Sequence, residues 1–481
     1  MSHIAVFGAG SWGTAFASIL ADGGSGSGSR DPMSTAPVPE VRVFVGDSAG
    51  RVKVLYTQSK RYETLTVPGC RVGSAMACQA LACGVFSLPE PACVLVVARK
   101  NGTLDVIHVD QDAESGKLLC TIHEDRMRVG LERWVGLRLS VNGLFACTSG
   151  GSFRHVDLAA CLHENAFEKD RVSDATCTWT IPSPLHHVAF YPPDASQPVT
   201  HVASGGEQVL LSIWSVERWW AHYRQPTEAL ETPSTPPTSK KRAAPTSSKH
   251  RELAPGEVWR AKNLPNDHLS LARPPMIRCI GFARHTPPDG AQDALASMRV
   301  MVGTKDGLLR VYEPSKKPRH VQEWPVVPKG QGSIRVLHAM PHTLLVSDTS
   351  RHLYMLDGRT GHVQFQYKDM TGTVSDVLTL HDSQQGRTWV LSASLDHLIR
   401  LFGTQRSTML EQYFTGTDHA VSLVVDPQWT PPVPHNDDED VWAHMSTVGQ
   451  DASDDDSDTD ADEASAQRAE KRHRRTVEKA V

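Results

Sequence analysis

The feature of this sequence that most constrains its fold is a hairpin pattern that recurs seven times. In each copy an apolar run meets a short turn of polar residues or glycine, and a second apolar run follows. The turns include Asn101-Gly102 and Asp306-Gly307, and β-branched and aromatic residues flank them, which is typical of two antiparallel strands joined by a tight turn. The copies occupy residues 41–56, 94–109, 144–158, 202–216, 300–314, 344–358 and 390–404.

Two further strand-like segments belong to each copy. An alternating stretch follows each hairpin, at 63–67, 117–123, 175–181, 256–261, 320–326, 362–367 and 410–414. A second apolar segment then follows, at 77–88, 134–140, 185–191, 277–284, 334–340, 374–381 and 420–425. Four antiparallel strands in each of seven repeats predict an all-β fold, a seven-bladed WD-repeat β-propeller.

The spacing of the hairpin turns locates an insert. Successive turns lie 44 to 55 residues apart, except for one interval of 101 residues between Gly206 and Gly307. That interval contains residues 225–255, which are rich in Pro, Ser, Thr and Lys and cannot bury enough apolar area to offset the entropy of ordering. We therefore predict a disordered insert at 225–255, with Trp219 and Trp220 in a short helix or packed lip before it.

The order of the segments predicts how the ring closes. The first hairpin has no innermost strand before it, and the last apolar segment, 420–425, has no hairpin after it. We expect the last strand to complete the first blade, which leaves no exposed sheet edge. The predicted domains are a leader and Gly/Ser linker at 1–32, a propeller at 40–426 and a disordered tail at 427–481.

Composition excludes several classes of protein. The chain has 481 residues, 40% of them hydrophobic, and no apolar run approaches the roughly 18 residues of a membrane span, so no membrane partner is expected. Its nine cysteines form no zinc-like pairs, which favours reduced, buried thiols and no metal. Residues 435–481 carry fourteen Asp or Glu against six Lys or Arg, so the net charge of −5 belongs to the tail.

A Gly-rich motif near the N-terminus suggests nucleotide binding but is incomplete. Gly8, Gly10 and Gly13 follow a strand-like segment, in the order of a dinucleotide-binding turn, and resemble the opening of NAD-dependent glycerol-3-phosphate dehydrogenases. A Gly/Ser linker then replaces the second strand and its acidic ribose ligand, which the motif needs. We interpret residues 1–32 as a fused leader and predict no cofactor; an NAD-binding enzyme is the least favoured alternative.

Neither catalysis nor RNA readout has a motif in the remaining sequence. The chain has 23 histidines, but none of them belongs to a recognisable set of nucleophile, general base and general acid. We therefore predict no catalytic residues and no enzyme activity. Asp47, Asp306, Asp348 and Asp396 lie where a carboxylate can cap the amides of a turn. The basic residues considered for direct RNA contact are Arg51, Lys53, Lys305, Arg310 and Arg400.

Several stretches together resemble one family. These are Gly46-Asp-Ser-Ala-Gly50-Arg-Val-Lys53, Glu257-Val-Trp259-Arg-Ala-Lys262-Asn263-Leu-Pro265-Asn266-Asp267, residues 302–314 and Leu395-Asp396-His-Leu-Ile-Arg400. They look like the signature stretches of the WD-repeat nucleolar ribosome-biogenesis factors of the fungal Nsa type, which are related to animal WD repeat-containing protein 74. The resemblance covers about residues 41–425.

That resemblance implies a non-enzymatic assembly factor for the large ribosomal subunit precursor. The implied partners are other assembly factors, ribosomal proteins and an AAA-type ATPase that releases the factor, with rRNA as a further candidate. Trp259, Arg260, Lys262 and Asn263 become candidate partner-surface residues. The alternative for these four is structural: Trp259 buried between blades, with the other three capping strands.

The tail predicts where the protein works. An acidic block at 451–463 precedes a basic cluster that contains Lys471, Arg472, Arg474 and Arg475, of the kind that importins bind. Lys240, Lys241 and Arg242 in the insert form a second, weaker cluster. We therefore expect importin as a partner, and localisation to the nucleus and nucleolus. The main alternative function is that of a WD-repeat adaptor in another complex, such as a ubiquitin ligase.

Overall fold

The computed structural model describes residues 38–88, 90–110, 115–158, 161, 176–224, 253–266, 268–284, 294–382, 387–405 and 407–431. The predicted leader and the tail beyond residue 431 lie outside these ranges. So do residues 225–252 of the predicted insert.

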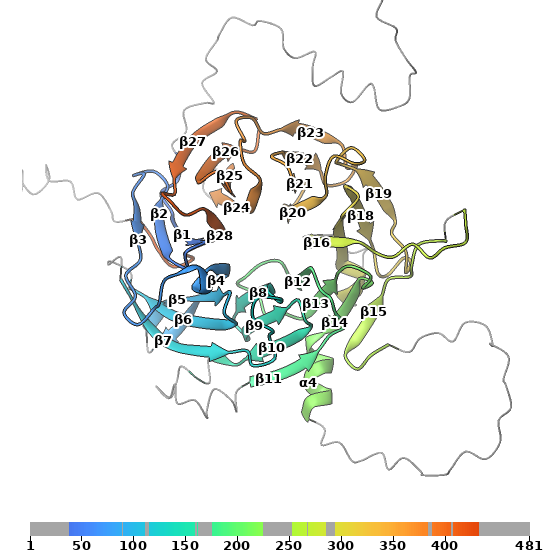
Figure 1. The fold of residues 1–481 in the computed structure, drawn as a ribbon, viewed down its shortest axis with the longest axis horizontal. Helices are drawn as coiled ribbons and strands as arrows, with labels where there is room; N and C mark the ends of the chain where they lie inside the picture. Colours follow the sequence, from blue (N-terminus) through green and yellow to red (C-terminus); the bar gives the residue numbers. More distant parts are fainter. Residues whose placement is uncertain are drawn as a thin grey trace, which may run out of the picture. The chain divides into compact units, whose positions relative to one another are not determined.

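The described chain is nearly all β-structure, arranged as seven small sheets around a centre (Figure 1). Each sheet is a blade of four antiparallel strands, and the strands run in sequence from the centre outward in every blade but the first. This arrangement is a seven-bladed β-propeller, and it confirms the predicted fold class.

The first four blades follow the predicted segments closely. Blade 1 consists, from the inside outward, of β28 (Ala420–Val425), β1 (Arg42–Asp47), β2 (Val52–Tyr56) and β3 (Tyr62–Thr64). Blade 2 contains β4 (Cys78–Leu88), β5 (Glu90–Arg99), β6 (Thr103–Val109) and β7 (Gly116–His123). Blade 3 contains β8 (Trp134–Ser140), β9 (Gly143–Thr148), β10 (Ser152–Val156) and β11 (Thr176–Thr180). Blade 4 contains β12 (His187–Tyr191), β13 (His201–Gly205), β14 (Ser212–Ser215) and β15 (Glu257–Arg260).

The last three blades have the same plan. Blade 5 contains β16 (Ile277–Arg284), β17 (Met298–Thr304), β18 (Leu308–Tyr312) and β19 (Gln322–Pro325). Blade 6 contains β20 (Ile334–Ala339), β21 (Thr343–Asp348), β22 (Leu353–Asp357) and β23 (Val363–Gln366). Blade 7 contains β24 (Val374–Asp382), β25 (Arg387–Ser394), β26 (Leu398–Gly403) and β27 (Met409–Phe414). In the described residues, the short 3₁₀ helices η2 (Ser74–Met76) and η3 (Ala294–Ser297) lie in connections.

The ring closes as predicted, through the first blade. The last strand, β28, pairs antiparallel with β1, so residues from the two ends of the propeller share one sheet. The structured chain continues past the predicted boundary at 426. Trp429 packs against Tyr56 with ring centroids 5.4 Å apart, and Gln428 donates a side-chain hydrogen bond to the Pro91 carbonyl at 2.6 Å.

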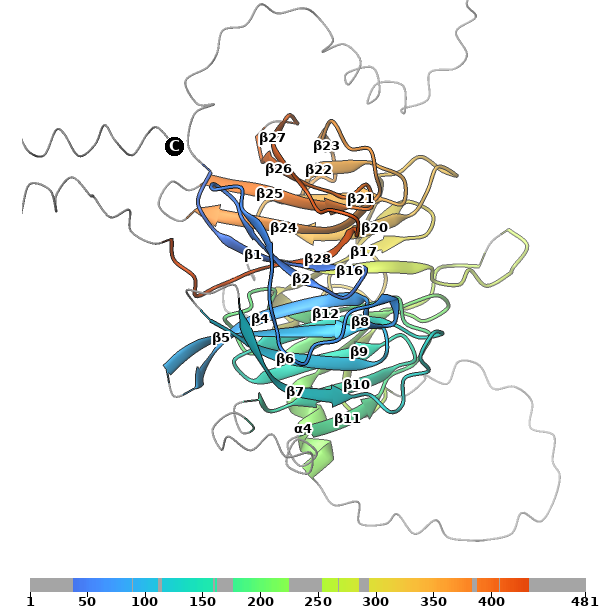
Figure 2. The same ribbon diagram turned by 60° about the vertical axis from the view of Figure 1, so that its left-hand side comes forward.

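The core consists of seven clusters of buried apolar side chains, one between each pair of neighbouring blades. Strand β5 shows how one strand serves two clusters. Cys93, Leu95 and Val97 pack toward blade 1, whereas Val94, Val96 and Ala98 pack toward blade 3. Successive side chains of a strand point to opposite faces, and both faces of a blade are covered by its neighbours. This explains why the hairpins read as continuous apolar runs rather than alternating ones. Figure 2 shows the strands of blade 2 in order from β4 to β7.

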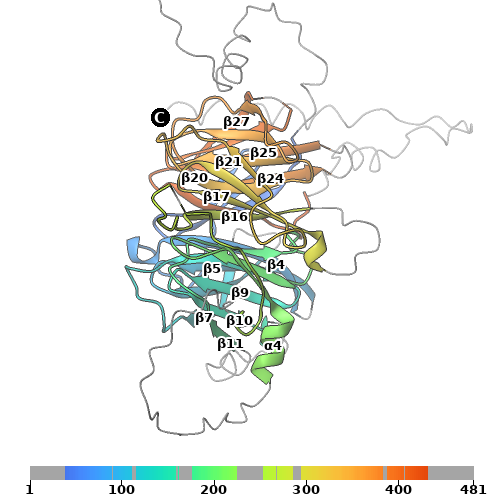
Figure 3. The same cartoon turned by 90° about the vertical axis from the view of Figure 1, so that its right-hand side faces the viewer.

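Helix α4 (Val216–Arg224) interrupts the repeat in blade 4. It follows β14 and lies beside the outer strands of blade 3 (Figure 3). Trp219 stacks between Trp179 of β11 and Trp214 of β14, at centroid distances of 5.1 and 5.5 Å. Gly256 allows this close packing, because a Cβ there would lie only 2.2 Å from the Trp219 ring. The predicted helix or packed lip is thus a helix, and it begins before the two tryptophans.

Candidate functional site: the mouth of the central channel

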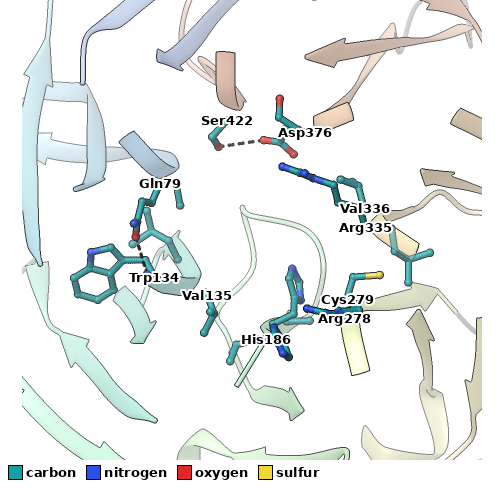
Figure 4. Close-up of a pocket in the computed structure, with 18 of the residues that line it drawn as sticks. Gln79, Trp134, Val135, His186, Arg278, Cys279, Arg335, Val336, Asp376 and Ser422 are labelled. Atoms are coloured by element: carbon teal, nitrogen blue, oxygen red, sulfur yellow. Dashed lines mark hydrogen bonds between the residues drawn. The ribbon is translucent and has the colours of Figure 1, made fainter. Parts of the chain in front are cut away.

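The innermost strands of all seven blades surround a cavity of about 720 Å³ on the axis of the propeller. Figure 4 shows it with side chains from several blades directed toward the opening. Most of the residues that line the cavity lie at or just before the start of an innermost strand, so the cavity lies toward the end of the propeller where these strands begin. The turns between the second and third strands of each blade lie at the same end. In blade 6, for example, the amide of Thr349 in such a turn donates a hydrogen bond to the carbonyl of Ser333, which directly precedes the innermost strand β20. We call this end the turn face.

A shared backbone irregularity directs one residue per blade into the channel. In six of the seven innermost strands, the pairing with the next strand slips by one residue near the start of the strand. Such a bulge leaves an extra residue outside the regular ladder. These residues all line the cavity: Gln79, Val135, Arg278, Arg335, Ser375 and Val421. Strand β12 pairs without a slip, and His186, the residue before it, lines the cavity there.

Three arginines gather at the mouth of the channel: Arg133, Arg278 and Arg335, which we call the arginine cluster. Burial lowers the pKa of Arg133, and the positive charges of Arg278 and Arg335 lower it further. Within the part of the chain that the structure describes, neither Arg278 nor Arg335 has a side-chain hydrogen bond or an ion-pair partner. Arg133 donates one weak hydrogen bond to the His186 carbonyl, at 3.4 Å. The cluster therefore carries positive charge that no nearby carboxylate of the described residues neutralises by direct contact.

The histidines of the channel add little to that charge. Burial lowers the pKa of His186, and the charges of Arg278 and Arg133 lower it further. Burial brings the pKa values of His187 and His338 down to about 4, so both rings are neutral at pH 7. As neutral rings they bridge blades: Ile280 donates its amide hydrogen to Nδ1 of His187 at 3.3 Å, and Nε2 of His338 lies 3.0 Å from Oγ1 of Thr379.

Two carboxylates lie near the arginine cluster and are already engaged. Glu207 is 3.6 Å from His186 and 3.7 Å from Lys305. Asp376 accepts hydrogen bonds from the amides of Val377 and Leu423, at 2.8 Å each, and from the Ser422 hydroxyl at 3.1 Å. Burial raises the pKa of Asp376 to about 6 despite those bonds. The Asp376 carboxylate thus joins blade 7 to blade 1 across the seam.

Other polar groups of the channel wall hold neighbouring blades together. The Gln79 side chain accepts the Trp134 amide hydrogen at 2.8 Å, between blades 2 and 3. The Ser422 hydroxyl accepts from the Leu81 amide at 3.3 Å, and the Ser375 hydroxyl donates to the Ala420 carbonyl at 2.6 Å. These side chains are structural, which leaves the arginine cluster as the group at the mouth with unused binding capacity.

The four predicted partner-surface residues lie elsewhere, on the outer strand β15 and the loop after it. Trp259 is half-buried and contacts Tyr312 of blade 5 edge-on, with centroids 6.1 Å apart. Arg260 forms an ion pair with Glu257 of the same strand, Nε to Oε1 2.6 Å. The Lys262 amide donates to the Pro318 carbonyl at 2.7 Å, and Asn263 caps the next amide at 2.9 Å. The structure does not bring them to the channel mouth.

The residues predicted to bind importin lie outside the described residues. They are Lys240, Lys241, Arg242, Lys471, Arg472, Arg474 and Arg475.

Most of the basic residues considered for RNA contact are held in ion pairs. Lys53 is buried and donates to the Thr415 carbonyl, close to Asp47. Arg310 pairs with Glu323 at 2.7 Å, and Arg400 pairs with Asp396 at 2.7 Å. Arg51 and Lys305 are more exposed than these three residues. Arg51 faces Asp418, and Lys305 faces Glu207. The turn caps predicted for Asp47, Asp348 and Asp396 are confirmed, since each accepts amide hydrogen bonds within its turn.

Cys83, Cys93 and Asp426 form a group of residue types that can bind metals, but the carboxylate is already hydrogen-bonded and the thiols are buried. The sulfurs of Cys83 and Cys93 lie 3.2 Å apart, and a carboxylate oxygen of Asp426 completes a set within 4.8 Å. That carboxylate already accepts from Arg42 Nε at 2.8 Å and from the amides of Gln428 and Trp429. The neighbouring thiol and burial raise the pKa of Cys83, which disfavours the thiolate form that metals bind. We interpret the group as part of the packing between blades 1 and 2.

The arginine cluster was not predicted, because its three members are spread over about 200 residues of the sequence. A usable signal is nevertheless present: Arg278 and Arg335 are each the second residue of an innermost strand, and Arg133 directly precedes one. Aligning the seven repeats on those strands would have placed the three arginines at one end of the ring. Among the described residues, no helix has the length and apolar character that crossing a membrane requires.

Comparison with known proteins identifies no family. No protein-family model matches the chain, and no curated protein matches it. Among solved structures, the crystal structure of the computationally designed Ika8 protein is similar over 81% of this chain and 91% of that chain, at 11% sequence identity and a TM-score of 0.44.

Proposed function

We propose that this protein is a non-enzymatic interaction scaffold that works in nucleolar maturation of the large ribosomal subunit precursor. The observation that carries the scaffold role is the turn face: it presents an arginine cluster with unused binding capacity at the centre of a rigid propeller. The other polar groups of the channel wall are engaged in holding blades together, which suits a docking platform better than a reaction chamber.

The ribosomal assignment is supported by the sequence resemblance. Three of its stretches include turns of the turn face: residues 46–53 between β1 and β2, residues 302–314 across β17 and β18, and residues 395–400 before and within β26. The fourth contains β15 and the loop that leads toward blade 5. The proposed partners are assembly factors and ribosomal proteins of the precursor, an AAA-type ATPase that releases the scaffold, rRNA as a further candidate, and importin for entry to the nucleus.

Affinity purification of the tagged chain from cells tests this proposal. We expect precursor proteins of the large subunit and pre-rRNA to co-purify, and the association to persist when the releasing ATPase is inactivated. Depletion of the protein is expected to impair maturation of large-subunit rRNA. Cullin subunits in place of ribosomal precursors, together with normal rRNA maturation, would replace this proposal with that of a ubiquitin-ligase adaptor.

A further inference from the structure

The arginine cluster has three properties of a binding site for an anionic group. Arg278 and Arg335 come from two different blades and lie at the cavity (Figure 4). Arg133, which directly precedes the innermost strand of a third blade, lines the same cavity. Their like charges repel, so the apo protein bears an electrostatic cost that an anion would relieve. Guanidinium groups also bind carboxylates and phosphates with paired, charge-assisted hydrogen bonds.

The surroundings of the cluster favour a polypeptide over a nucleic acid. Large apolar side chains are exposed in the connections and turns of the same face: Val72, Val129, Leu131 and Leu395. Leu131 is 82% exposed and lies two residues before Arg133. Exposed apolar groups around a polar anchor are typical of protein-binding surfaces.

Binding along a nucleic-acid backbone needs a track of free positive charges rather than one focus. Three other basic residues of the turn face lie beside carboxylates and do not add to such a track. Arg51 faces Asp418, Lys305 faces Glu207, and Arg128 pairs with Glu132 at 2.6 Å. Arg71, Lys100, Arg126, Lys329 and Arg351 in the connections and turns of this face are also exposed and have no ion pair among the described residues. The choice of a polypeptide therefore rests on the exposed apolar side chains around the arginine cluster.

We infer that the channel mouth binds an acidic polypeptide segment of a partner protein, with carboxylates on Arg133, Arg278 and Arg335 and flanking apolar residues on the exposed rim of the turn face. This inference rests on the proposed scaffold function and specifies its docking site. Arg278 and Arg335 occupy bulge positions, so the backbone of the innermost strands fixes where their side chains start.

Binding of labelled homopolymers to the full-length chain tests the inference. The probes are fluorescein-labelled decaglutamate, decaglutamine and decauridylate, followed by fluorescence anisotropy at one ionic strength. We expect decaglutamate to bind and decaglutamine not to bind. In the variant with Arg133→Gln, Arg278→Gln and Arg335→Gln, decaglutamate affinity is expected to fall about tenfold or more, because three charge contacts are lost.

The matched control removes the same charge from another surface. Lys317→Gln, Arg319→Gln and Arg359→Gln lie at exposed positions in turns at the opposite end of the blades, and should change the affinity less than about twofold. Arg335→Gln alone, at an exposed side chain without a partner among the described residues, gives a readout if the triple variant does not fold. Equal decaglutamate binding by wild type and triple variant, no decaglutamate binding at all, or arginine-dependent binding of decauridylate alone would each overturn the inference.

The outcome is separable from that of the proposed function. Co-purification with ribosomal precursors tests the assignment to the large subunit, whereas decaglutamate binding tests the chemistry of the channel mouth. Loss of arginine-dependent peptide binding with intact co-purification would leave the ribosomal role and remove this docking site.

Discussion

Arg42 and Asp426 form a buried ion pair at the seam of the propeller. The Arg42 guanidinium donates to the Asp426 carboxylate from Nε at 2.8 Å and also to the Asp110 carbonyl at 3.1 Å, so it links blade 1 to blade 2. Both side chains are almost completely buried. A charge in such a place is costly if its partner is removed.

Replacing Arg42 should therefore destabilise the fold far more than replacing an exposed arginine. For Arg42→Met we expect the free energy of unfolding to fall by about 3–5 kcal/mol, because the Asp426 carboxylate stays buried without its partner. The matched control is Arg51→Met, whose 3.5 Å pair with Asp418 is largely exposed and is worth roughly 0.5 kcal/mol. Urea denaturation measures both, and similar effects of the two substitutions would contradict this view of the seam.

Asp376 predicts a specific pH dependence. Its pKa is raised from 3.8 to about 6 in the folded protein, so the folded state binds this proton more tightly than the unfolded state does. Stability from this group is fully present below about pH 4 and is lost as the pH rises through about 6, by about 3 kcal/mol in total. In Asp376→Asn this contribution should disappear. Urea midpoints of wild type and variant between pH 4.5 and 7.5 measure it, and parallel curves for the two proteins would rule it out.

At the scale of single elements, helix α4 depends on one side chain. Trp219 is 2% exposed and stacks between Trp179 and Trp214. It also contacts Phe153, with ring centroids 4.8 Å apart. We expect Trp219→Ala to lower the free energy of unfolding by about 3–5 kcal/mol through lost burial and the cavity left behind. Tyr223→Ala, at a half-exposed side chain of the same helix, is the control and should have a much smaller effect. Thermal unfolding compares the two.

Strand β28 supplies the innermost position of blade 1. A chain that ends at Asp418 lacks this strand, so β1 loses its pairing partner and the cluster between blades 7 and 1 loses Ala420 and Leu423. We expect this chain to lose its cooperative thermal transition. A chain that ends at Pro431 keeps all described contacts and should melt like the full-length protein. If both shortened chains melted alike, closure through β28 would not be what holds the ring.

The elements show where sequence reasoning succeeds and where it stops. Strands such as β17 and β18 were predictable, because two apolar runs flank Asp306-Gly307 and the glycine adopts φ of +77° in the turn. The bulges that place Arg278 and Arg335 at the channel were not predictable, because a one-residue slip in strand pairing does not change the hydrophobic pattern of the sequence. The stretch around Trp259 predicts either a partner surface or burial between blades, and its contact with Tyr312 depends on the packing of blade 4 against blade 5.

At the scale of the whole molecule, the sequence predicts a subcellular localisation as well as a fold. Replacing Lys471, Arg472, Arg474 and Arg475 with Gln should shift the protein from the nucleus to the cytoplasm, because importins bind clustered positive charge. The matched control replaces Lys240, Lys241 and Arg242, which we expect to have a smaller effect. Fluorescence microscopy of tagged variants measures the distribution. Unchanged nuclear signal in the first variant would show that another segment directs import.

The number of blades and the closure of the ring followed from the sequence because repetition multiplies a weak signal. One hairpin is ambiguous, but seven at a nearly constant interval are not. The docking site is a property of the assembled ring, since its three arginines belong to different repeats and acquire a common location only when the blades stand side by side. Their significance therefore depended on the three-dimensional structure.

Closure through β28 has a consequence for biosynthesis. Strand β1 leaves the translating ribosome early, whereas its partner β28 is made roughly 370 residues later. At about 5–20 residues per second, that delay is on the order of half a minute. During this time the nascent first blade has three strands and an unpaired inner edge, the kind of surface that chaperones shield. Propeller completion is thus a late step that is timed by the emergence of the final strand.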